Sequence, residues 1–334
     1  MSLRIGILGA GGWGTALGLL LHQNDHAATL WEFQSELAER LKKTRENPDF
    51  LPGVTLPSGI EVTSDLEAAV SDKDMIVLAL PSHTVRQTAK ALSLVPIKHA
   101  LFVSGTKGIE NHTLLRMSEL ILQTVPDLTP ERVVVLSGPS HAEEVALSLP
   151  TVVVAASADP NASRKVQEAF MNPAFRVYTS DDVAGVEFGG AFKNVIAIAA
   201  GISDGVGFGD NTKAALVTRG IVEMTRLGGI LGANPSTFAG LSGLGDLVVT
   251  CWSRHSRNRY VGEQIGKGRK LSEVLKGMKM VAEGVRTTQS VYDLSQKHGA
   301  DTPISTEVYR MLFEGKVPKT AVFDLMTREK KTEV

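Results

Sequence analysis

A lysine and an asparagine interrupt an otherwise small and apolar segment of the sequence, EFGGAFKNVIAIAAG. The glycines and alanines of this segment leave room for a cofactor or another element to lie against it. A lysine that is largely withdrawn from water has a lowered pKa and can exchange a proton near neutral pH. Lys193 and Asn194 are therefore candidate catalytic residues. The alternative is a lysine at a helix edge whose ammonium group reaches solvent.

A second group of polar residues lies in the segment GLSGLGDLVVTCW. Asp246 and Thr250 are four residues apart, which places them on one face if the segment is helical. The carboxylate of Asp246 could hold and tune a lysine, and Thr250 could offer its hydroxyl group. The alternative for Asp246 is a helix cap after a glycine turn, a common use of aspartate.

A basic run follows this segment. Residues 254–270 contain six lysines or arginines and one acid, Glu263. Such a run can bind nucleic acid, but Tyr260 is its only aromatic residue and the whole chain is not basic. The planar guanidinium group of arginine suits a terminal phosphate. Arg257 and Asn258 therefore predict a site for a small molecule that carries a phosphate.

The N-terminal residues carry a glycine pattern that predicts a nucleotide site. Gly9, Gly11 and Gly14 form G-x-G-x-x-G between a short apolar strand, LRIGIL, and a helix, TALGLLLHQN. Such a turn lets a pyrophosphate approach the backbone and the positive end of the helix. Glu32 ends a second predicted strand, where this fold binds the adenosine ribose hydroxyls. A secretory signal is the alternative for this apolar start, but its glycines are poor material for an apolar helix.

Strand-like and helical stretches alternate along the first half of the chain. Apolar runs such as MIVLAL, RVVVLSG and TVVVAAS are separated by segments with helical periodicity, such as SHTVRQTAKALS. This alternation predicts βαβ units and a mostly parallel sheet covered by helices. Ligands of such sheets bind outside the carboxyl ends of the strands. Polar residues that follow strands there include Ser140, His141 and Lys107, the last of which could instead be an exposed loop lysine.

The character of the sequence changes at about residue 181, beyond which strand-like runs largely disappear and helical periodicity dominates. We therefore predict a Rossmann-type dinucleotide-binding domain at residues 1–180 and an all-helical, substrate-binding domain at residues 181–334. The cleft between two domains is a natural place for a small substrate.

Composition is that of a soluble globular protein with a sizeable core. The 334 residues are 43% hydrophobic and 21% charged. A net charge of −1 favours neither nucleic acid nor an anionic membrane. The single cysteine, Cys251, excludes an internal disulfide and fits a reducing compartment. One cysteine and eight scattered histidines form no zinc-ligand pattern, and so we predict no metal site.

Several long motifs, taken in order, resemble one family. GAGGWGTAL, SGTKGIE, SGPSHAEEV, EFGGAFKNVIAIAAGISDGVGFGDNTKAAL, GLSGLGDLVVTC and SRNRYVGEQIGKG are similar to those of the NAD(P)-dependent sn-glycerol-3-phosphate dehydrogenases of the bacterial cytosolic type. The resemblance spans nearly the whole chain. It implies a Rossmann-type doubly wound α/β sheet followed by an all-helical domain like that of 6-phosphogluconate dehydrogenase. The implied reaction interconverts dihydroxyacetone phosphate and sn-glycerol 3-phosphate with NAD or NADP, and it supplies phospholipid synthesis.

The resemblance also implies roles for individual residues. Lys193 would be the general acid or base on the C2 oxygen of the substrate, and Lys107 would contact both substrate and nicotinamide. Asp246 would orient the two lysines, and Thr250 would support them. The substrate would be held by these lysines and Asp246 and by Gly138, Ser140, Ser256, Arg257 and Asn258. The cofactor would be lined by Gly9, Gly11, Gly12, Trp13, Gly14, Phe33, Lys107, Ala142, Arg257, Val281 and Glu283.

Two positions depart from the family pattern. The family commonly has phenylalanine where this chain has His141, whose role the resemblance leaves open. Members that prefer NADP often carry a basic residue after the second strand, where this chain has Glu32 and Phe33. An acid near the ribose repels a 2′-phosphate, which favours NAD, although a neighbouring loop could supply a positive charge.

Other functions fit parts of the sequence. A β-hydroxyacid or polyol-phosphate dehydrogenase would have the same architecture, and activity without the phosphate would separate it from the family above. A catalytically silent nucleotide sensor would lack the catalytic lysines, and both are present. We expect a cytoplasmic enzyme that acts on a small molecule, binds no nucleic acid and inserts into no membrane. The resemblance alone implies that it is a homodimer.

Overall fold

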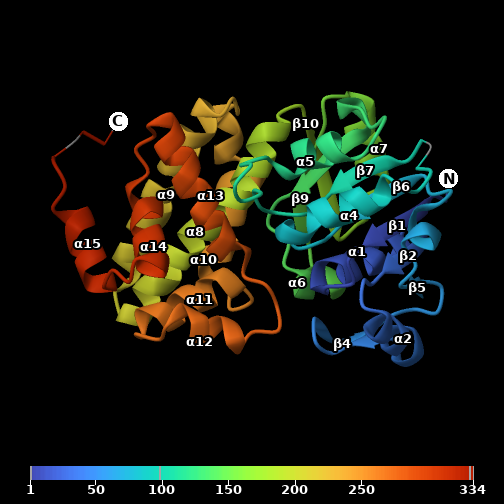
Figure 1. The fold of residues 1–334 in the computed structure, drawn as a ribbon, viewed down its shortest axis with the longest axis horizontal. Coiled ribbons are helices and arrows are strands. Elements are labelled where there is room, and N and C mark those ends of the chain that lie inside the picture. The colour runs from blue at the N-terminus through green and yellow to red at the C-terminus, as the bar shows by residue number, and fades with distance from the viewer. Residues whose placement is uncertain (1, 98, 331, 334) are drawn as a thin grey trace.

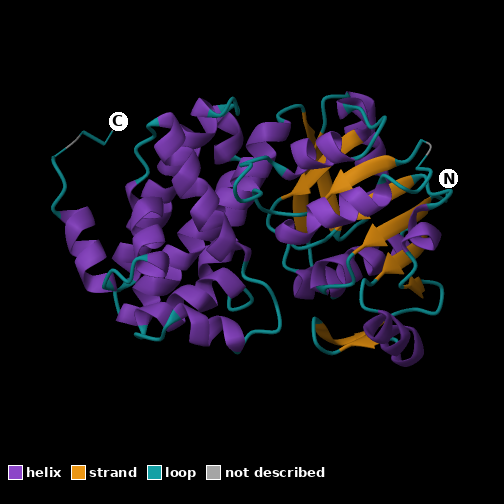
Figure 2. Ribbon diagram, in the orientation of Figure 1, coloured by secondary structure: helices purple, strands orange, loops and turns teal. Residues whose placement is uncertain are grey.

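The computed structural model describes residues 2–97, 99–330 and 332–333 of the chain. Figure 1 shows two bodies side by side, one built from the N-terminal residues and the other from the C-terminal residues. Every strand among the described residues lies in the first body, and the second is made of helices joined by loops (Figure 2). The last strand ends at Ser180, and a long helix begins at Val183.

Eight strands form the main sheet, in the order β10-β9-β8-β7-β6-β1-β2-β5. Their bounds are β1 (Arg4–Leu8), β2 (Ala27–Trp31), β5 (Glu61–Thr63), β6 (Met75–Leu78), β7 (Leu101–Ser104), β8 (Val133–Ser137), β9 (Thr151–Ala156) and β10 (Phe175–Ser180). All neighbouring pairs are parallel except β8 and β9, so that β9 and β10 run against the other six strands. The predicted Rossmann-type, mostly parallel sheet is confirmed.

Helices cover both faces of this sheet. They are α1 (Gly12–Gln23), α2 (Ser35–Thr44), α3 (Leu66–Val70), α4 (Val85–Leu92), α5 (Met117–Thr124), α6 (Ala142–Ala146) and α7 (Pro160–Phe170), with 3₁₀ turns η1 (Ser82–Thr84) and η2 (Pro130–Arg132). Ile5 and Ile7 of β1 pack with α1 and α7 on one face, whereas Leu8 packs with α4 and α5 on the other. This alternation follows from the pleat of the strand, which points successive side chains to opposite faces.

The sequence-based prediction misses β5 and a two-stranded hairpin formed by β3 (Glu46–Asn47) and β4 (Leu51–Thr55). β5 has only three residues, and β4 contains Pro52 and Gly53, two residue types that are depleted in strands. Short strands without an alternating apolar pattern give little signal. Figure 1 shows the hairpin next to α2, at the edge of the first body.

The first strand, the glycine turn and α1 form the unit predicted from the sequence. Gly9 has a φ of +109°, a conformation that side chains rarely adopt. α1 begins at Gly12, so that Gly12 and Gly14 lie in its first turn, which corrects the prediction of a helix from Thr15. A side chain at position 14 would overlap the carbonyl oxygen of Gly9. The glycines therefore let α1 pack closely against the end of β1.

Helix α8 (Val183–Val206) is the core of the second body. It is long and apolar enough by composition to cross a membrane, but 89% of its apolar window is buried inside the protein. Around it lie α9 (Asp210–Ile230), η3 (Pro235–Ala239), the π-helical turn η4 (Leu241–Gly245), α10 (Asp246–Trp252), α11 (Arg257–Gly266), α12 (Leu271–Lys276), α13 (Glu283–His298), α14 (Pro303–Phe313) and α15 (Pro318–Met326).

Helices α8 and α11 cross with their backbones in contact. Gly201 on α8 and Gly262 on α11 face the partner helix without a side chain. A Cβ atom at Gly201 would overlap the carbonyl oxygen of Arg259, and one at Gly262 would overlap that of Ile198. Because the backbones touch, the N-terminal end of α11 lies close to the middle of α8.

Replacement of Gly262 by alanine is expected to destabilise the protein by about 1–3 kcal/mol, because the added methyl group would force two packed backbones apart. Urea unfolding followed by circular dichroism measures this change as a lower midpoint. Gly229→Ala is the matched control, since an added Cβ in this part of α9 would meet its nearest neighbour, on Pro235, at 3.8 Å. Equal stability of the two variants would contradict the close crossing.

Candidate active site

One buried carboxylate holds two lysines. Lys193 on α8 donates hydrogen bonds to Oδ1 of Asp246 and, at 2.8 Å, to Oγ1 of Thr250. Lys107, in the loop after β7, donates to Oδ2 of Asp246 at 2.7 Å and to the carbonyl oxygen of Gly138 at 3.0 Å. Asp246 is only 1% exposed. The structure therefore brings the four main catalytic candidates into one cluster.

The elements around this cluster decide between the interpretations left open by the sequence. Asp246 begins α10 directly after the π-helical turn η4, a type of turn that is frequent at functional sites. Thr250 lies one helical turn later, on the same face, and its hydroxyl group donates to the carbonyl oxygen of Asp246 at 2.5 Å. Asp246 provides no side-chain cap, Lys193 is buried, and the side chain of Lys107 is only 19% exposed. The capping aspartate and the solvent-exposed lysines are therefore excluded.

The cluster changes the proton affinity of its members. Burial lowers the pKa of Lys193 to about 7; the charge of Lys107 adds to this effect, and that of Asp246 opposes it. Burial alone would raise the pKa of Asp246, but the two ammonium groups hold that pKa below its usual value. Lys193 can therefore gain or lose a proton near neutral pH while Asp246 stays ionised.

Each of the two lysines has one N–H group that donates no hydrogen bond to a described residue. An ammonium group has three donors. Lys193 uses two of them, for Asp246 and Thr250, and Lys107 uses two, for Asp246 and Gly138. The two remaining donors are available to an oxygen atom of a bound molecule. The cluster is therefore suited to stabilise negative charge on that oxygen and to protonate it.

The amide of Asn258 joins three helices next to the lysine cluster. Its Nδ2 donates to Oδ1 of Asn194 at 2.9 Å, and its Oδ1 accepts from the backbone N–H of Gly284 at 2.9 Å. Asn194 follows Lys193 in α8, so that these bonds hold the N-terminal end of α11 beside the cluster. Asn258 thus positions Asn194, and its predicted contact with substrate stays a prediction.

The N-terminal end of α11 presents an unpaired guanidinium group. Arg257 is exposed, and no described residue forms a hydrogen bond or ion pair with its side chain. Ser256 caps the helix by accepting from the N–H of Arg259 at 3.2 Å. On the sheet side, the hydroxyl group of Ser140 donates to the carbonyl oxygen of Gly138 at 3.0 Å. A free guanidinium at the start of a helix is suited to an anion.

His141 lies close to the cluster as a neutral residue. Burial and the charge of Lys193 lower the pKa of His141 to about 4. Its Nε2 atom is buried and has no hydrogen-bond partner among the described residues. Its ring lies 5.9 Å from that of His255, measured between centroids. Near neutral pH, Lys193 is therefore better matched to proton exchange than His141.

The crevice at the carboxyl ends of β1 and β2 fits the phosphates of a dinucleotide. Gly11 precedes α1 without a side-chain cap, and a Cβ added there would meet no atom within 4 Å. Gly11 therefore faces open space at the N-terminal end of α1, where a pyrophosphate can bind. A Cβ at Gly12 would lie 2.7 Å from the backbone oxygen of Phe50, because the hairpin loop lies against the first turn of α1. The Nε1 atom of Trp13 is buried without a described partner.

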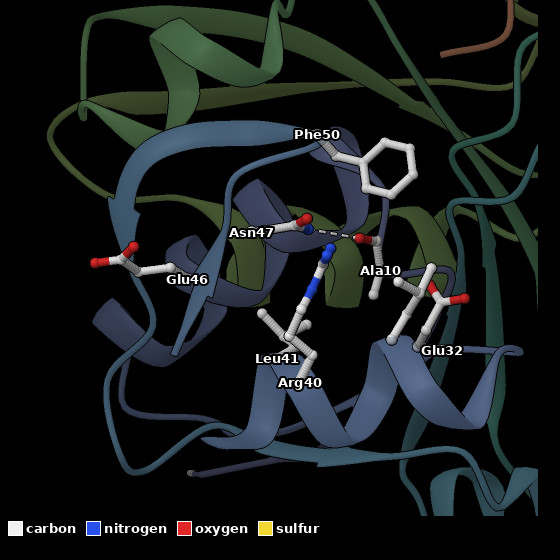
Figure 3. A pocket seen from close by; sticks show the side chains of 8 residues that line it. Ala10, Glu32, Arg40, Leu41, Glu46, Asn47 and Phe50 are labelled. Carbon is white, nitrogen blue, oxygen red and sulfur yellow. Dashed lines mark hydrogen bonds between the residues drawn. The ribbon is translucent and has the colours of Figure 1, made fainter. Parts of the chain in front are cut away.

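A small pocket opens beside the glycine turn, at the end of β2 (Figure 3). Glu32 follows β2 and lines this pocket with Ala10, Arg40, Asn47 and Phe50, among others. Burial raises the pKa of Glu32, and its Oε1 accepts from the N–H of Gln34 at 3.1 Å. The acid thus lies where the sequence predicts the adenosine ribose.

Sequence reasoning missed most of the residues that line this pocket, among them Asn47, Arg40 and Phe50. Asn47 donates to the carbonyl oxygen of Ala10 at 2.7 Å, as the dashed line in Figure 3 shows, and thereby holds the glycine turn. Arg40 comes from α2 and Phe50 from the hairpin loop. The only available signal was their position shortly after Glu32. Phe33, which was predicted, is 70% exposed and lies edge-on to Trp31.

Glu283 links the two bodies. Its carboxylate accepts from the N–H of Ser82 at 2.9 Å and from the hydroxyl group of the same residue at 2.5 Å. Ser82 begins η1, which follows β6 at the carboxyl edge of the sheet. Val281 lies two residues before Glu283 and is partly buried. Contacts of both residues with a cofactor stay a prediction.

Comparison with known proteins identifies the family. Two family models match the chain: NAD-dependent glycerol-3-phosphate dehydrogenase N-terminus over residues 4–163, and the corresponding C-terminus over residues 182–323. The chain belongs to the NAD-dependent glycerol-3-phosphate dehydrogenase family. The resemblance drawn from the sequence motifs is therefore confirmed, and with it the prediction that the chain is an NAD(P)-dependent dehydrogenase.

Members of this family are similar to the chain over its whole length. The glycerol-3-phosphate dehydrogenase [NAD(P)+] of Prosthecochloris aestuarii is 53% identical over 330 residues, 99% of each chain. That of Lysinibacillus sphaericus is 51% identical and covers 99% of this chain and 98% of its own. The solved glycerol-3-phosphate dehydrogenase of Coxiella burnetii has a TM-score of 0.93 at 36% identity, covering 98% of this chain and 99% of that one. The predicted fold class is thus confirmed.

Proposed function

We propose that this chain interconverts dihydroxyacetone phosphate and sn-glycerol 3-phosphate, with NAD or NADP as cofactor. The observation that carries this proposal is the buried cluster in which Asp246 holds Lys107 and Lys193, each with one free N–H group. The unpaired guanidinium of Arg257 lies at the start of α11, which Asn258 ties to α8 beside the cluster. Family membership and the names of the relatives support the proposal.

Lys193 is the proposed general acid and base. In reduction, its ammonium group donates a proton to the C2 oxygen of the ketone, and in oxidation its neutral amine takes that proton back. Lys107 donates its free N–H group to the same oxygen and stabilises the negative charge that develops there. Asp246 and Thr250 fix the direction of the Lys193 side chain. The nicotinamide, when bound, supplies or accepts the hydride.

The phosphate end of the substrate is assigned to the start of α11. Arg257 offers parallel N–H donors that match two phosphate oxygens. The other residues proposed to form this phosphate-binding site are Ser256, Asn258, Gly138 and Ser140. The phosphate does not react, so that its binding serves to hold the carbonyl in place beside the lysines. Binding energy from this remote group should therefore raise turnover as well as affinity.

The proposed cofactor site follows the crevice at the ends of β1 and β2. The phosphates would bind at the start of α1, and the adenosine would lie towards Glu32 and Phe33. We propose that NAD is preferred, because the carboxylate of Glu32 repels a 2′-phosphate. The residues that would hold the cofactor are Gly9, Gly11, Gly12, Trp13, Gly14, Phe33, Lys107, Ala142, Arg257, Val281 and Glu283.

The proposal extends to the organisation of the protein and its place in the cell. We propose that residues 1–180 bind the cofactor and that residues 181–334 complete the substrate site. The family resemblance supports a cytoplasmic homodimer that supplies glycerol 3-phosphate for phospholipid synthesis. Light scattering on the purified protein measures the oligomeric state, and a monomer at all concentrations would contradict the dimer.

The rate of reduction is expected to fall as the pH rises through about 7, whereas the rate of oxidation is expected to rise. The pKa of Lys193 lies near this value, reduction needs its protonated form, and oxidation needs its neutral form. Steady-state rates measured in both directions, on either side of pH 7, check this prediction. Profiles that change in the same direction for both reactions would contradict the role of Lys193.

Replacement of Arg257 by leucine is expected to lower kcat/KM for dihydroxyacetone phosphate by about 100-fold or more, because the phosphate loses a charged contact with two donors. Dihydroxyacetone, which lacks the phosphate, should be a poor substrate for wild type and for Arg257→Leu. Its kcat/KM should be similar for the two proteins. Arg254→Leu is the matched control, since Arg254 belongs to the same basic run and is exposed. Equal losses in Arg257→Leu and Arg254→Leu would remove Arg257 from the phosphate site.

A further inference from the structure

Asp49 holds two cations that come from different parts of the chain. It lies in the loop between β3 and β4, and its Oδ2 pairs with Nη2 of Arg40 on α2. Its Oδ1 lies 2.7 Å from Nζ of Lys279, in the loop between α12 and α13. Figure 1 shows this loop of the helical body reaching towards β4. Both hydrogen bonds lower the pKa of Asp49, so that it is ionised at neutral pH.

Arg40 also lines the pocket at the end of β2. Figure 3 shows its side chain rising from α2 into this pocket, which Glu32 and Glu46 also line, with the carboxylate of Glu46 pointing away from Arg40. Among the described residues that line the pocket, Arg40 is the only cation. The pocket lies where the fold binds the adenosine ribose, because Glu32 follows β2 and Ala10 belongs to the glycine turn.

The charges around the pocket at the end of β2 determine how strongly the pocket can bind a phosphate on the ribose. Glu32 is an acid, and the charge of Arg40 is offset by its ion pair with Asp49. A second cation, Lys279, pairs with the same carboxylate. A 2′-phosphate would therefore meet the acid Glu32 and an arginine whose charge is offset by its ion pair with Asp49. Without Asp49, the planar guanidinium group would be free to bind that phosphate.

We propose that Asp49 is a specificity-determining residue, which withholds Arg40 from the 2′-phosphate of NADP and so favours NAD. The inference rests on the proposed function, because it concerns the cofactor of that same site. Asp49 acts through Arg40 and is therefore a positioning residue. It lies 17 positions after Glu32, outside the segment directly after β2 in which a basic residue would be sought.

Calorimetric titration of the full-length protein with NADP⁺ and, separately, with NAD⁺ tests this proposal without relying on catalysis. We expect Asp49→Asn to raise the affinity for NADP⁺ by about tenfold relative to wild type, since Arg40 gains a charge-assisted contact with the phosphate. The affinity for NAD⁺ should change little. Glu39→Gln is the matched control, because it removes an acid from the exposed side of α2 without releasing Arg40.

Two further variants separate specificity from a structural effect on the hairpin. Asp49→Glu keeps the carboxylate and should retain the wild-type preference. Asp49→Asn combined with Arg40→Gln should lose the gain in NADP⁺ affinity, because the gain depends on the freed guanidinium. The inference would be overturned if Asp49→Asn left the ratio of NADP⁺ to NAD⁺ affinity unchanged. It would also be overturned if Glu39→Gln changed this ratio as much as Asp49→Asn does.

The proposed function fails by a different result. Binding of neither dinucleotide to the folded wild-type protein would overturn both the proposed function and the role of Asp49. Binding of both, with reduction of dihydroxyacetone phosphate but with no effect of Asp49→Asn on the ratio, would overturn the role of Asp49 alone.

Discussion

Replacement of Lys193 by methionine is expected to lower turnover by about 10³-fold while the fold and cofactor binding persist. Methionine keeps the apolar length of the side chain in the core of α8 but can neither donate a proton nor stabilise charge on the substrate oxygen. Asp246 remains paired with Lys107 at 2.7 Å in this variant, so that no buried charge is left alone. Steady-state kinetics measures turnover, fluorescence titration with NADH measures cofactor binding, and thermal unfolding measures whether the fold persists.

Lys267→Met is the matched control for this experiment. Lys267 follows α11, is 51% exposed, and pairs only with Glu263 among the described residues. Its loss should leave turnover unchanged. Turnover of Lys193→Met close to that of Lys267→Met would exclude Lys193 as the proton donor. Loss of NADH binding in Lys193→Met, together with loss of turnover, would assign the lysine to the cofactor site instead.

Replacement of Asp246 by asparagine is expected to lower the free energy of unfolding by about 3–5 kcal/mol, because two neighbouring ammonium groups lose the buried carboxylate that pairs with both. The same change should abolish turnover, since the direction of Lys193 is no longer fixed. Urea unfolding measures the stability. Asp74→Asn is the control, because Asp74 pairs with Arg4 at the surface, where an ion pair contributes about 1 kcal/mol or less.

A double variant distinguishes repulsion between the lysines from a general defect in packing. Lys193→Met combined with Asp246→Asn removes one ammonium group along with the carboxylate. This protein should therefore be more stable than Asp246→Asn alone, as expected for residues in direct contact. Strictly additive losses of stability in the two single variants and the double variant would contradict the shared cluster.

Much of the site could be predicted from local patterns in the sequence. The four-residue spacing of Asp246 and Thr250 indicated one helical face, and the glycine pattern indicated the turn before α1, where the phosphates of a dinucleotide would bind. The same patterns could not decide whether Lys193 is buried, because α8 is apolar on nearly all sides and offers no polar face for comparison. The contact of Lys107 with Asp246 spans 139 positions, and no local pattern encodes it.

The pocket at the end of β2 was harder to predict than the lysine cluster. Arg40 lies on an otherwise polar helix, where an arginine has no distinguishing signal. Asn47 and Phe50 belong to a hairpin with short strands that carry Pro52 and Gly53. Their importance comes from tertiary placement, which brings them against the glycine turn at Ala10. A prediction based on the residues directly after β2 therefore finds Glu32 but not the ion pairs around it.

The most direct test of the proposed reaction is oxidation of reduced cofactor by dihydroxyacetone phosphate, followed by absorbance with wild-type protein. NADH and NADPH are assayed separately, and dihydroxyacetone serves as the substrate without phosphate. We expect rapid oxidation with dihydroxyacetone phosphate, more efficient with NADH than with NADPH, and little oxidation with dihydroxyacetone. A folded protein that binds the cofactors but oxidises neither in the presence of dihydroxyacetone phosphate would contradict the proposed function.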